Sequence, residues 1–380
     1  MKKRAISILL TAAMAASALA VGTVTVSAEE EKEKFVIGMS QCNLGEPWRV
    51  AMNDQIERAA EKYPEFEVIF ADAAQDNSKQ IADIENFVQM GVDLLLVSPN
   101  EATPLTNAVS AAYDAGIPVI LLDRKIDGDK YTQFIGADNV EMGRVAGEYV
   151  ADVLLPDGGK VCEIKGLEGT SGGIDRDKGF REGIAKNENI VIVAENNADW
   201  LREKAITVAE EMLQTNDEID LFIALNDPMA EGAYIAAKNA GREGDIMFIG
   251  FDGLATPDGG IRSVIDGRLS MTQVYPTGGA EAIESAYQLL VEGKELDKTL
   301  TLESEVVTPD TAEELLAKYS GSEDGEAAEE TTEDAAAEEE ATEETAAEEE
   351  TADDAAAEEE ATDAAATEEA AEDTEKAAEE

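Results

Sequence analysis

Beyond Lys34, short apolar segments alternate with longer amphipathic segments, and this regular alternation most constrains the fold. Each short segment is bounded by turn residues, which predicts a strand, and each longer one has apolar residues three and four positions apart, which predicts a helix. The predicted strands cover residues 35–39, 67–70, 94–98, 119–122, 160–164, 190–195, 221–224, 247–251, 270–274 and 300–307. The predicted helices cover residues 48–62, 78–90, 103–115, 140–153, 175–186, 201–213, 229–239, 260–265 and 278–290.

Repeated strand–helix units predict parallel sheets that are covered by helices on both faces. The units are too numerous for one compact sheet. Two α/β domains of about 130–150 residues each agree with the usual domain size. We therefore expect an α/β protein with two doubly wound parallel-sheet domains.

The N-terminal segment has the features of a secretory signal peptide. It begins with the basic stretch MKKR, continues with apolar residues 5–26 and ends in small residues at Ala28. A membrane anchor is the rival interpretation, but this stretch is rich in Ala, Ser, Thr and Gly and only moderately apolar. We expect residues 1–28 to be removed and the mature protein to be exported, either to the periplasm or outside the cell.

The C-terminal segment, residues 321–380, consists almost wholly of Ala, Glu, Asp and Thr. It contains 28 acidic side chains and one lysine, which is about half of the net charge of −55. Such a segment cannot bury a core and repels itself, so we expect a disordered acidic tail. The remainder is also acidic, and this argues against a nucleic-acid partner, since binding phosphates requires a basic surface.

The chain has two cysteines, Cys42 and Cys162, and no histidine. An exported protein could pair the cysteines, which would link the two halves of the chain. We expect two separate thiols and assign them no chemistry. The absence of histidine removes the commonest general base and metal ligand.

Polar and aromatic residues follow the predicted strands at the ends where open parallel sheets bind ligands. One example is the segment VILLDRKIDG, in which a buried strand is followed by Asp123 and Arg124. Neighbours on a strand point to opposite faces, so we do not expect these two to form an ion pair. We expect Asp123 to lie in a solvated cleft. The candidates selected in this way are Gln41, Trp48, Arg49, Asp123, Arg124, Arg176, Trp200, Asn226, Asp252 and Gln273.

This mixture of acids, amides, arginines and both tryptophans suits a neutral sugar. Sugar hydroxyls donate to carboxylates and accept from guanidinium or amide groups, and charge-assisted bonds are the strong ones. Flat aromatic rings provide large apolar contact areas. Each residue also has an ordinary structural interpretation: Asp123 could cap a turn, Arg176 could form a surface ion pair, and a tryptophan could belong to the core. Their occurrence at successive strand ends favours sugar binding.

An enzyme is the competing class, because two carboxylates can hydrolyse a glycosidic bond. No acid–base pair stands out, and the chain contains no HExxH, no GxGxxG opening a helix and no GxxxxGK[ST]. Binding without turnover is the simpler interpretation, so we expect no enzymatic activity and no cofactor.

Residues 35 to about 310 resemble the ribose-binding-like periplasmic binding proteins, the sugar-capturing subunits of ATP-driven importers. The segments that include SQ, EPWR and IDRDKGF are most similar to the galactofuranose-binding branch. The matching stretches are IPVILLDRKID (117–127), GADNVEMG (136–143), EGTSGGIDRDKGFREGI (168–184), LNDPMAEGAYIAAKNAG (225–241), GFDG (250–253) and DGRLSMTQVYP (266–276).

The resemblance implies two doubly wound domains joined by three hinge crossings, near Ala137, Val274 and Leu302. The expected N-terminal domain comprises residues 35–136 plus 275–302. The expected C-terminal domain comprises residues 137–274 plus 303–318. The sugar would lie in the cleft between these domains.

The resemblance also implies roles for individual residues. Trp48 and Trp200 would stack on opposite faces of the sugar ring, and Gln273 would lie at the hinge. Gln41 and Asn139 are weaker candidates. The residues that would bond hydroxyls are Arg49, Asp123, Arg124, Arg176, Asn226 and Asp252.

The sequence departs from the family pattern at one position that bears on the ligand. Pentose binders carry two adjacent aromatic residues in the first loop, whereas Arg49 follows Trp48 here. This favours a ligand with more hydroxyls than ribose, such as a hexose, in furanose form. No calcium loop is visible, so we expect no metal.

The resemblance implies a monomer that captures a monosaccharide and delivers it to the membrane permease of an ABC importer. A sensor that presents the sugar to a membrane receptor is the alternative. We expect the acidic tail to contribute nothing to sugar affinity.

Overall fold

The computed structural model describes residues 34–320. The predicted signal peptide and the predicted acidic tail lie outside the described residues. Within the described part, strands and helices alternate as the sequence predicts, and no helix there is long and apolar enough to cross a membrane.

The first sheet has six parallel strands in the order β11-β5-β4-β3-β1-β2. Its strands β3 and β4 are buried along their whole length, as expected for a sheet that is covered on both faces. The strands are β1 (Phe35–Gln41), β2 (Phe66–Asp72), β3 (Leu94–Val97), β4 (Val119–Leu122), β5 (Gln133–Ala137) and β11 (Thr299–Leu302).

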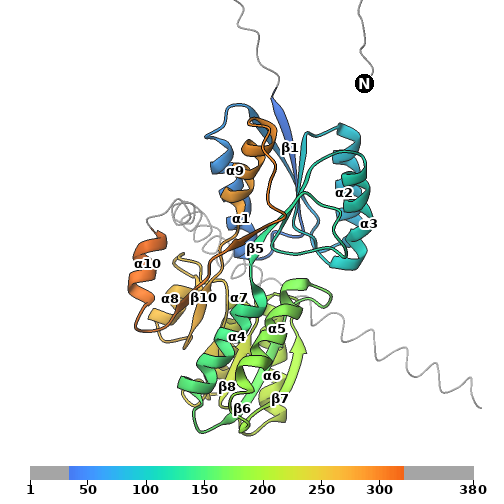
Figure 1. The fold of residues 1–380 in the computed structure, drawn as a ribbon. Helices are drawn as coiled ribbons and strands as arrows, with labels where there is room; N and C mark the ends of the chain where they lie inside the picture. The colour runs from blue at the N-terminus through green and yellow to red at the C-terminus, as the bar shows by residue number, and fades with distance from the viewer. Residues whose placement is uncertain (1–33, 321–380) are drawn as a thin grey trace, which may run out of the picture. The chain divides into compact units, whose positions relative to one another are not determined.

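Helices cover both faces of this sheet (Figure 1). Alternate residues of β3 belong to different apolar clusters: Leu95 packs with α2 and α3, whereas Leu96 packs with α1 and α9. Because successive side chains of a strand point to opposite faces, β3 contributes side chains to two separate apolar cores. The helices are α1 (Pro47–Ala60), α2 (Asn77–Met90), α3 (Ala102–Asp114) and α9 (Gly279–Leu290).

The second sheet has four parallel strands in the order β7-β6-β8-β9. Single bridges, such as Asp252 with Val274, connect its edge to β10, which pairs antiparallel with β12. The strands are β6 (Gly159–Lys165), β7 (Ile190–Asn197), β8 (Leu221–Ala224), β9 (Met247–Ile249), β10 (Thr272–Val274) and β12 (Glu305–Val307).

Helix α4 packs on α5, and α6 packs on α7. The first pair is unusually close. A Cβ atom on Gly143 would lie 2.2 Å from the carbonyl oxygen of Arg176, and one on Gly179 would lie 2.0 Å from that of Val140. The helices are α4 (Asn139–Tyr149), which continues as a π-helical turn (Val150–Leu154), α5 (Ser171–Ile184), α6 (Arg202–Thr215), α7 (Asp227–Asn239), α8 (Gly260–Ile265) and α10 (Ala312–Ser320).

The chain passes between the two sheet regions after β5, after β10 and after β11, so three segments connect them. These passages fall near Ala137, Val274 and Leu302, where the sequence places the hinge crossings. The division into two domains at these boundaries, and their role as a hinge, remain predictions.

Four details differ from the sequence prediction. Strand β5 was not expected, because its segment QFIGA begins with a polar residue and contains glycine. Residues 300–307 form two strands rather than one, and α10 was also missed. Helix α5 begins at Ser171 rather than at residue 175, although Gly172 and Gly173 weaken helices in general.

Candidate functional site

A cavity lies where loops from the ends of both sheets meet. Eight of the eleven predicted residues line it. The complete lining is Glu46, Trp48, Arg49, Asp123, Arg124, Gly172, Arg176, Trp200, Asn226, Asp252 and Tyr275.

A tight turn places Asp123 in this cavity. Strand β4 ends at Leu122, and Asp123 has a positive φ of 63°. The backbone N–H of Arg124 donates to the carbonyl of Leu122 at 2.6 Å, which closes a three-residue turn. The chain therefore leaves the strand geometry at Asp123, and the rule that neighbours point to opposite faces no longer applies.

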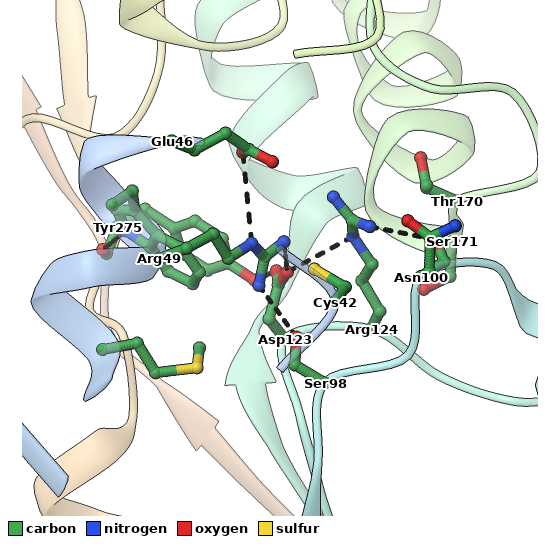
Figure 2. Close-up of polar contacts among 12 residues, drawn as sticks. Cys42, Glu46, Arg49, Ser98, Asn100, Asp123, Arg124, Thr170, Ser171 and Tyr275 are labelled. Atoms are coloured by element: carbon green, nitrogen blue, oxygen red, sulfur yellow. Dashed lines mark hydrogen bonds and ion pairs between the residues drawn. The ribbon is translucent and has the colours of Figure 1, made fainter. Parts of the chain in front are cut away.

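The expectation that Asp123 and Arg124 do not pair is consequently wrong. Arg124 Nε lies 3.7 Å from Asp123 Oδ2, and both residues are buried. The expectation of a solvated acid is also wrong, because protein groups occupy both carboxylate oxygens. Arg49 Nη2 donates to Oδ2 at 2.5 Å, and the Tyr275 hydroxyl donates to Oδ1 at 2.5 Å (Figure 2).

The charges around Asp123 determine its ionisation. Burial opposes ionisation, but Arg49, Arg124 and the hydroxyl of Tyr275 outweigh it and lower the pKa of Asp123. Burial and the neighbouring carboxylate raise the pKa of Tyr275. Asp123 is therefore a carboxylate and Tyr275 a phenol over the physiological range, which fixes the direction of their hydrogen bond.

Arg49 is held by both ends of its guanidinium group. Its Nη1 donates to Ser98 Oγ at 2.8 Å, and its Nε lies 4.0 Å from Glu46 Oε2 (Figure 2). The Nε atom is buried and has no hydrogen-bond partner among the described residues. Arg124 is fixed through Nη1, which donates to the carbonyl of Asn100 at 2.9 Å.

The aromatic residues form two walls. The Trp48 ring stacks on Tyr275 with centroids 5.0 Å apart, and its Nε1 donates to the Tyr275 carbonyl at 2.8 Å. One face of Trp48 is thus covered by protein. The Trp200 ring packs against Gly166, where a Cβ atom would lie 2.1 Å from the ring. The guanidinium group of Arg124 lies 5.6 Å from the centre of the Trp200 ring.

Arg176 is positioned by the close packing of α4 on α5. Its Nε donates to Asn139 Oδ1 at 2.6 Å, and its Nη1 donates to the carbonyl of Leu225 at 2.6 Å. Its guanidinium group lies 4.6 Å from the centre of the Tyr275 ring. Asn139 therefore acts on the cavity through Arg176.

Asn226 and Asp252 come from the loops after β8 and β9. Asn226 caps α7: its Oδ1 accepts from the N–H of Met229, and its Nδ2 donates to the carbonyl of Trp200. No donor among the described residues bonds the carboxylate of Asp252. Burial and the nearby Asp227 raise the pKa of Asp252. Asp252 is thus a buried acceptor that faces the cavity without a protein partner.

Three predicted residues do not line the cavity. Gln41 bonds Asn53, Asn139 bonds Arg176, and Gln273 bonds the carbonyl of Met142. Three lining residues were not selected from the sequence: Glu46, Gly172 and Tyr275. Glu46 and Tyr275 could have been found, because both adjoin selected residues at the ends of predicted elements.

Backbone strain is concentrated at this site. Six non-glycine residues of the described part have positive φ, a conformation that costs about 1–3 kcal/mol and clusters at ligand clamps. Asp123, Trp200 and Asp252 line the cavity itself. The other three are Ala74, Gln75 and Asp199.

One motif requires an explicit exclusion. Residues 169–173 read Gly-Thr-Ser-Gly-Gly and match the GxSxG spacing of a hydrolase nucleophile, between a strand and a helix. The Ser171 hydroxyl oxygen accepts the N–H of Lys125 at 2.9 Å, and the chain has no histidine to activate it. Ser171 therefore has a structural contact, and no Ser–His pair can form.

The described residues offer no group of three or more acidic, cysteine or histidine side chains that could hold a metal. Cys42 and Cys162 are both buried and free, which confirms the expectation of two separate thiols. Burial raises the pKa of Cys162 to about 12, so it is an inert thiol at neutral pH.

The fold and the cavity define a solute-binding protein with two α/β sheet regions and a polar site between their loops. The chain belongs to the periplasmic binding proteins, since the family described as "Periplasmic binding protein domain" matches residues 37–295. Its fold is the type I fold of this family. The family binds solutes and is not enzymatic.

Individual relatives agree with this assignment. The ribose import binding protein RbsB of Bacillus subtilis (strain 168) is 37% identical over 71% of this chain and 86% of its own length. The galactofuranose-binding protein YtfQ of Escherichia coli (strain K12) is 32% identical over 75% and 91%. A solved structure, the fructose-binding periplasmic domain of a hybrid two-component system, is 41% identical with a TM-score of 0.72, covering 75% and 94%.

Proposed function

We propose that this protein is exported, captures a monosaccharide in the cavity and delivers it to the membrane permease of an ABC importer. The observation that carries the proposal is the composition of the lining. Three carboxylates face three guanidinium groups, and three aromatic rings complete the walls. With all six groups ionised the formal charges cancel, which suits a neutral, hydroxyl-rich ligand.

The unpaired groups indicate how such a ligand would be held. Among the described residues, no donor bonds the carboxyl group of Asp252, which lines the cavity, and Arg49 Nε has no acceptor. Leaving buried polar groups unpaired is costly, so a ligand that supplies the missing partners gains affinity. A sugar hydroxyl can both donate and accept, and Asp252 and Arg49 would each bond one. Asp123, Arg124, Arg176 and Asn226 would bond further hydroxyls.

The ring would lie against the indole of Trp200. Tyr275 covers one face of Trp48, so the sugar would stack on the other face of this indole. Ribose, galactofuranose and fructose are the ligands in the names of the relatives above, so we expect a monosaccharide rather than a longer sugar. A hexose or pentose in furanose form is the ligand class that we favour. Within it, Arg49 in the place of a second aromatic residue favours a hexose over ribose.

A thermal-shift screen tests this proposal. A ligand that binds only the folded protein raises its stability by mass action. The panel would contain D-ribose, D-fructose, D-galactose, D-allose and myo-inositol, and titration calorimetry would follow each hit. Mass spectrometry of the released ligand should show an unchanged sugar. A panel without any shift contradicts the proposal.

A sensor function is the second candidate, and a specific observation favours it. The structure that is 41% identical is the periplasmic domain of a hybrid two-component system. Deleting the gene separates the candidates. Loss of radiolabelled sugar uptake supports transport, whereas retained uptake with lost sugar-dependent gene expression supports sensing.

A further inference from the structure

Two strained loops from different sheet regions meet beside the cavity. The loop between β2 and α2 contains Ala74 and Gln75, with φ values of 50° and 61°. The loop between β7 and α6 contains Asp199 and Trp200, with φ values of 54° and 72°. In each loop two consecutive non-glycine residues adopt the left-handed conformation, which persists only where surrounding contacts enforce it.

A single side chain connects these loops. Gln75 Nε2 donates to the carbonyl oxygen of Asp199 at 3.2 Å. Neither residue lines the cavity, but Asp199 directly precedes Trp200, whose ring does. The carbonyl of Trp200 itself accepts from Asn226 Nδ2 at 3.1 Å. The backbone that carries the Trp200 ring is therefore fixed from both sheet regions.

Gln75 is itself held in place. Its backbone N–H donates to the carbonyl of Cys42 at 2.8 Å, and its carbonyl accepts from Asn100 Nδ2 at 3.2 Å. The carbonyl of Asn100 accepts from Arg124 Nη1 at 2.9 Å. A continuous series of hydrogen bonds thus runs from Arg124 in the cavity, through Asn100 and Gln75, to the loop of Trp200.

We propose that Gln75 is a positioning residue that holds the loop of Trp200 across the bound sugar and thereby sets the rate of sugar release. This inference rests on the proposed function. The crossing bond forms only when the two sheet regions approach each other, so it stabilises the closed arrangement. This bond does not change the association rate of the sugar, because Gln75 lies outside the cavity.

The test compares Gln75→Met, which keeps the length of the side chain but lacks the donor, with the wild-type mature chain. Both tryptophans line the cavity, so stopped-flow tryptophan fluorescence reports binding directly. D-ribose, D-fructose and D-galactose serve as probes. We expect the dissociation rate to rise roughly fivefold, as for one lost hydrogen bond, with an unchanged association rate. The ratio of affinities among the sugars should stay constant.

Ala74→Gly is the matched control. It relaxes the neighbouring left-handed residue and leaves the crossing bond in place, so its release rate should equal that of the wild type. Equal acceleration in both variants would show that loop stiffness, not the bond, controls release, and would overturn the inference. An unchanged release rate in Gln75→Met, with normal wild-type binding, also overturns it. A wild-type protein that binds none of the probes overturns the proposed function first.

Discussion

The Tyr275 hydroxyl donates to the carboxylate of Asp123 at 2.5 Å, and the Tyr275 ring stacks on Trp48. One side chain thereby fixes both the charge and the aromatic wall of the cavity. Asn139 Nδ2 completes the arrangement by donating to the same hydroxyl at 3.4 Å. Tyr275 follows β10 at a passage between the sheet regions, so its contacts join parts of the chain that are far apart in sequence.

Replacing Tyr275 with phenylalanine keeps the stacking and removes the bond to Asp123. We expect sugar affinity to fall roughly tenfold, about 1.4 kcal/mol, because a hydrogen bond to a charged group is lost inside the cavity. Titration calorimetry measures the change. The control is Tyr113→Phe, since Tyr113 is 39% exposed on α3. Equal affinity in the two variants would contradict the role of the hydroxyl.

Replacing Asp123 with alanine leaves the guanidinium groups of Arg49 and Arg124 buried without their acid. Removing one partner of a buried ion pair costs about 3–5 kcal/mol. We therefore expect the free energy of unfolding of the empty protein to fall by about 3 kcal/mol, with sugar affinity falling as well. Thermal unfolding and calorimetric titration check both effects.

Asp114→Ala is the control for this change, because the ion pair of Asp114 with Lys130 is exposed and contributes little. A variant at Asp123 that melts like the wild type but binds sugar weakly would show that Asp123 serves the ligand alone. Normal affinity together with a lowered melting temperature would show that its role is purely structural.

Replacing Gly166 with alanine tests the position of Trp200. The new Cβ atom would lie 2.1 Å from Trp200 Cε2, so the ring must shift. Overpacking of this kind costs about 1–3 kcal/mol, and we expect sugar affinity to fall at least about fivefold. Gly244→Ala is the control, because no atom lies within 4 Å of the added Cβ. Near-ultraviolet circular dichroism should report the ring shift in the first variant only.

The sequence predicts the sheets and most of the site because both follow local rules. Apolar runs such as residues 119–122 predict buried strands, and polar residues after them predict the ligand edge. Eight of the ten residues selected by this rule line the cavity. This pattern of apolar runs followed by polar residues does not predict which contacts each side chain makes in the cavity.

The errors arise where tertiary contacts override the local pattern. The left-handed conformation of Asp123 turns an expected pair of opposed charges into neighbours, and no periodicity reveals that φ. Gly172 and Gly173 suggest a loop, yet they belong to α5, where Thr170 and the Trp200 ring leave little room for a side chain at Gly173. Tyr275 becomes important only through contacts with Trp48 and Asp123, which are distant in sequence.

Within residues 34–320 no donor bonds the buried carboxyl group of Asp252, and burial together with Asp227 raises its pKa. The folded protein therefore holds this proton to higher pH than the unfolded chain, where the pKa is about 3.9. Between the pKa of Asp252 in the unfolded chain and its pKa in the folded protein, the folded state binds more protons. The contribution of Asp252 to stability is therefore fully present below the pKa of the unfolded chain. That contribution is lost as pH rises through the folded pKa.

Asp252→Asn removes this titration while keeping the size of the side chain. We expect the empty variant to gain stability relative to the wild type as pH rises above 4, because only the wild type then carries a buried acid that must give up its proton. The difference should shrink towards zero at pH 4, where Asp252 is protonated. Sugar affinity should fall at least about tenfold, since an amide NH₂ group replaces one carboxyl oxygen that faces the sugar. Calorimetric melting from pH 4 to 8 and sugar titration measure both effects. Parallel stability curves for the two proteins would contradict the assigned titration, and unchanged affinity would exclude Asp252 as an acceptor for the sugar.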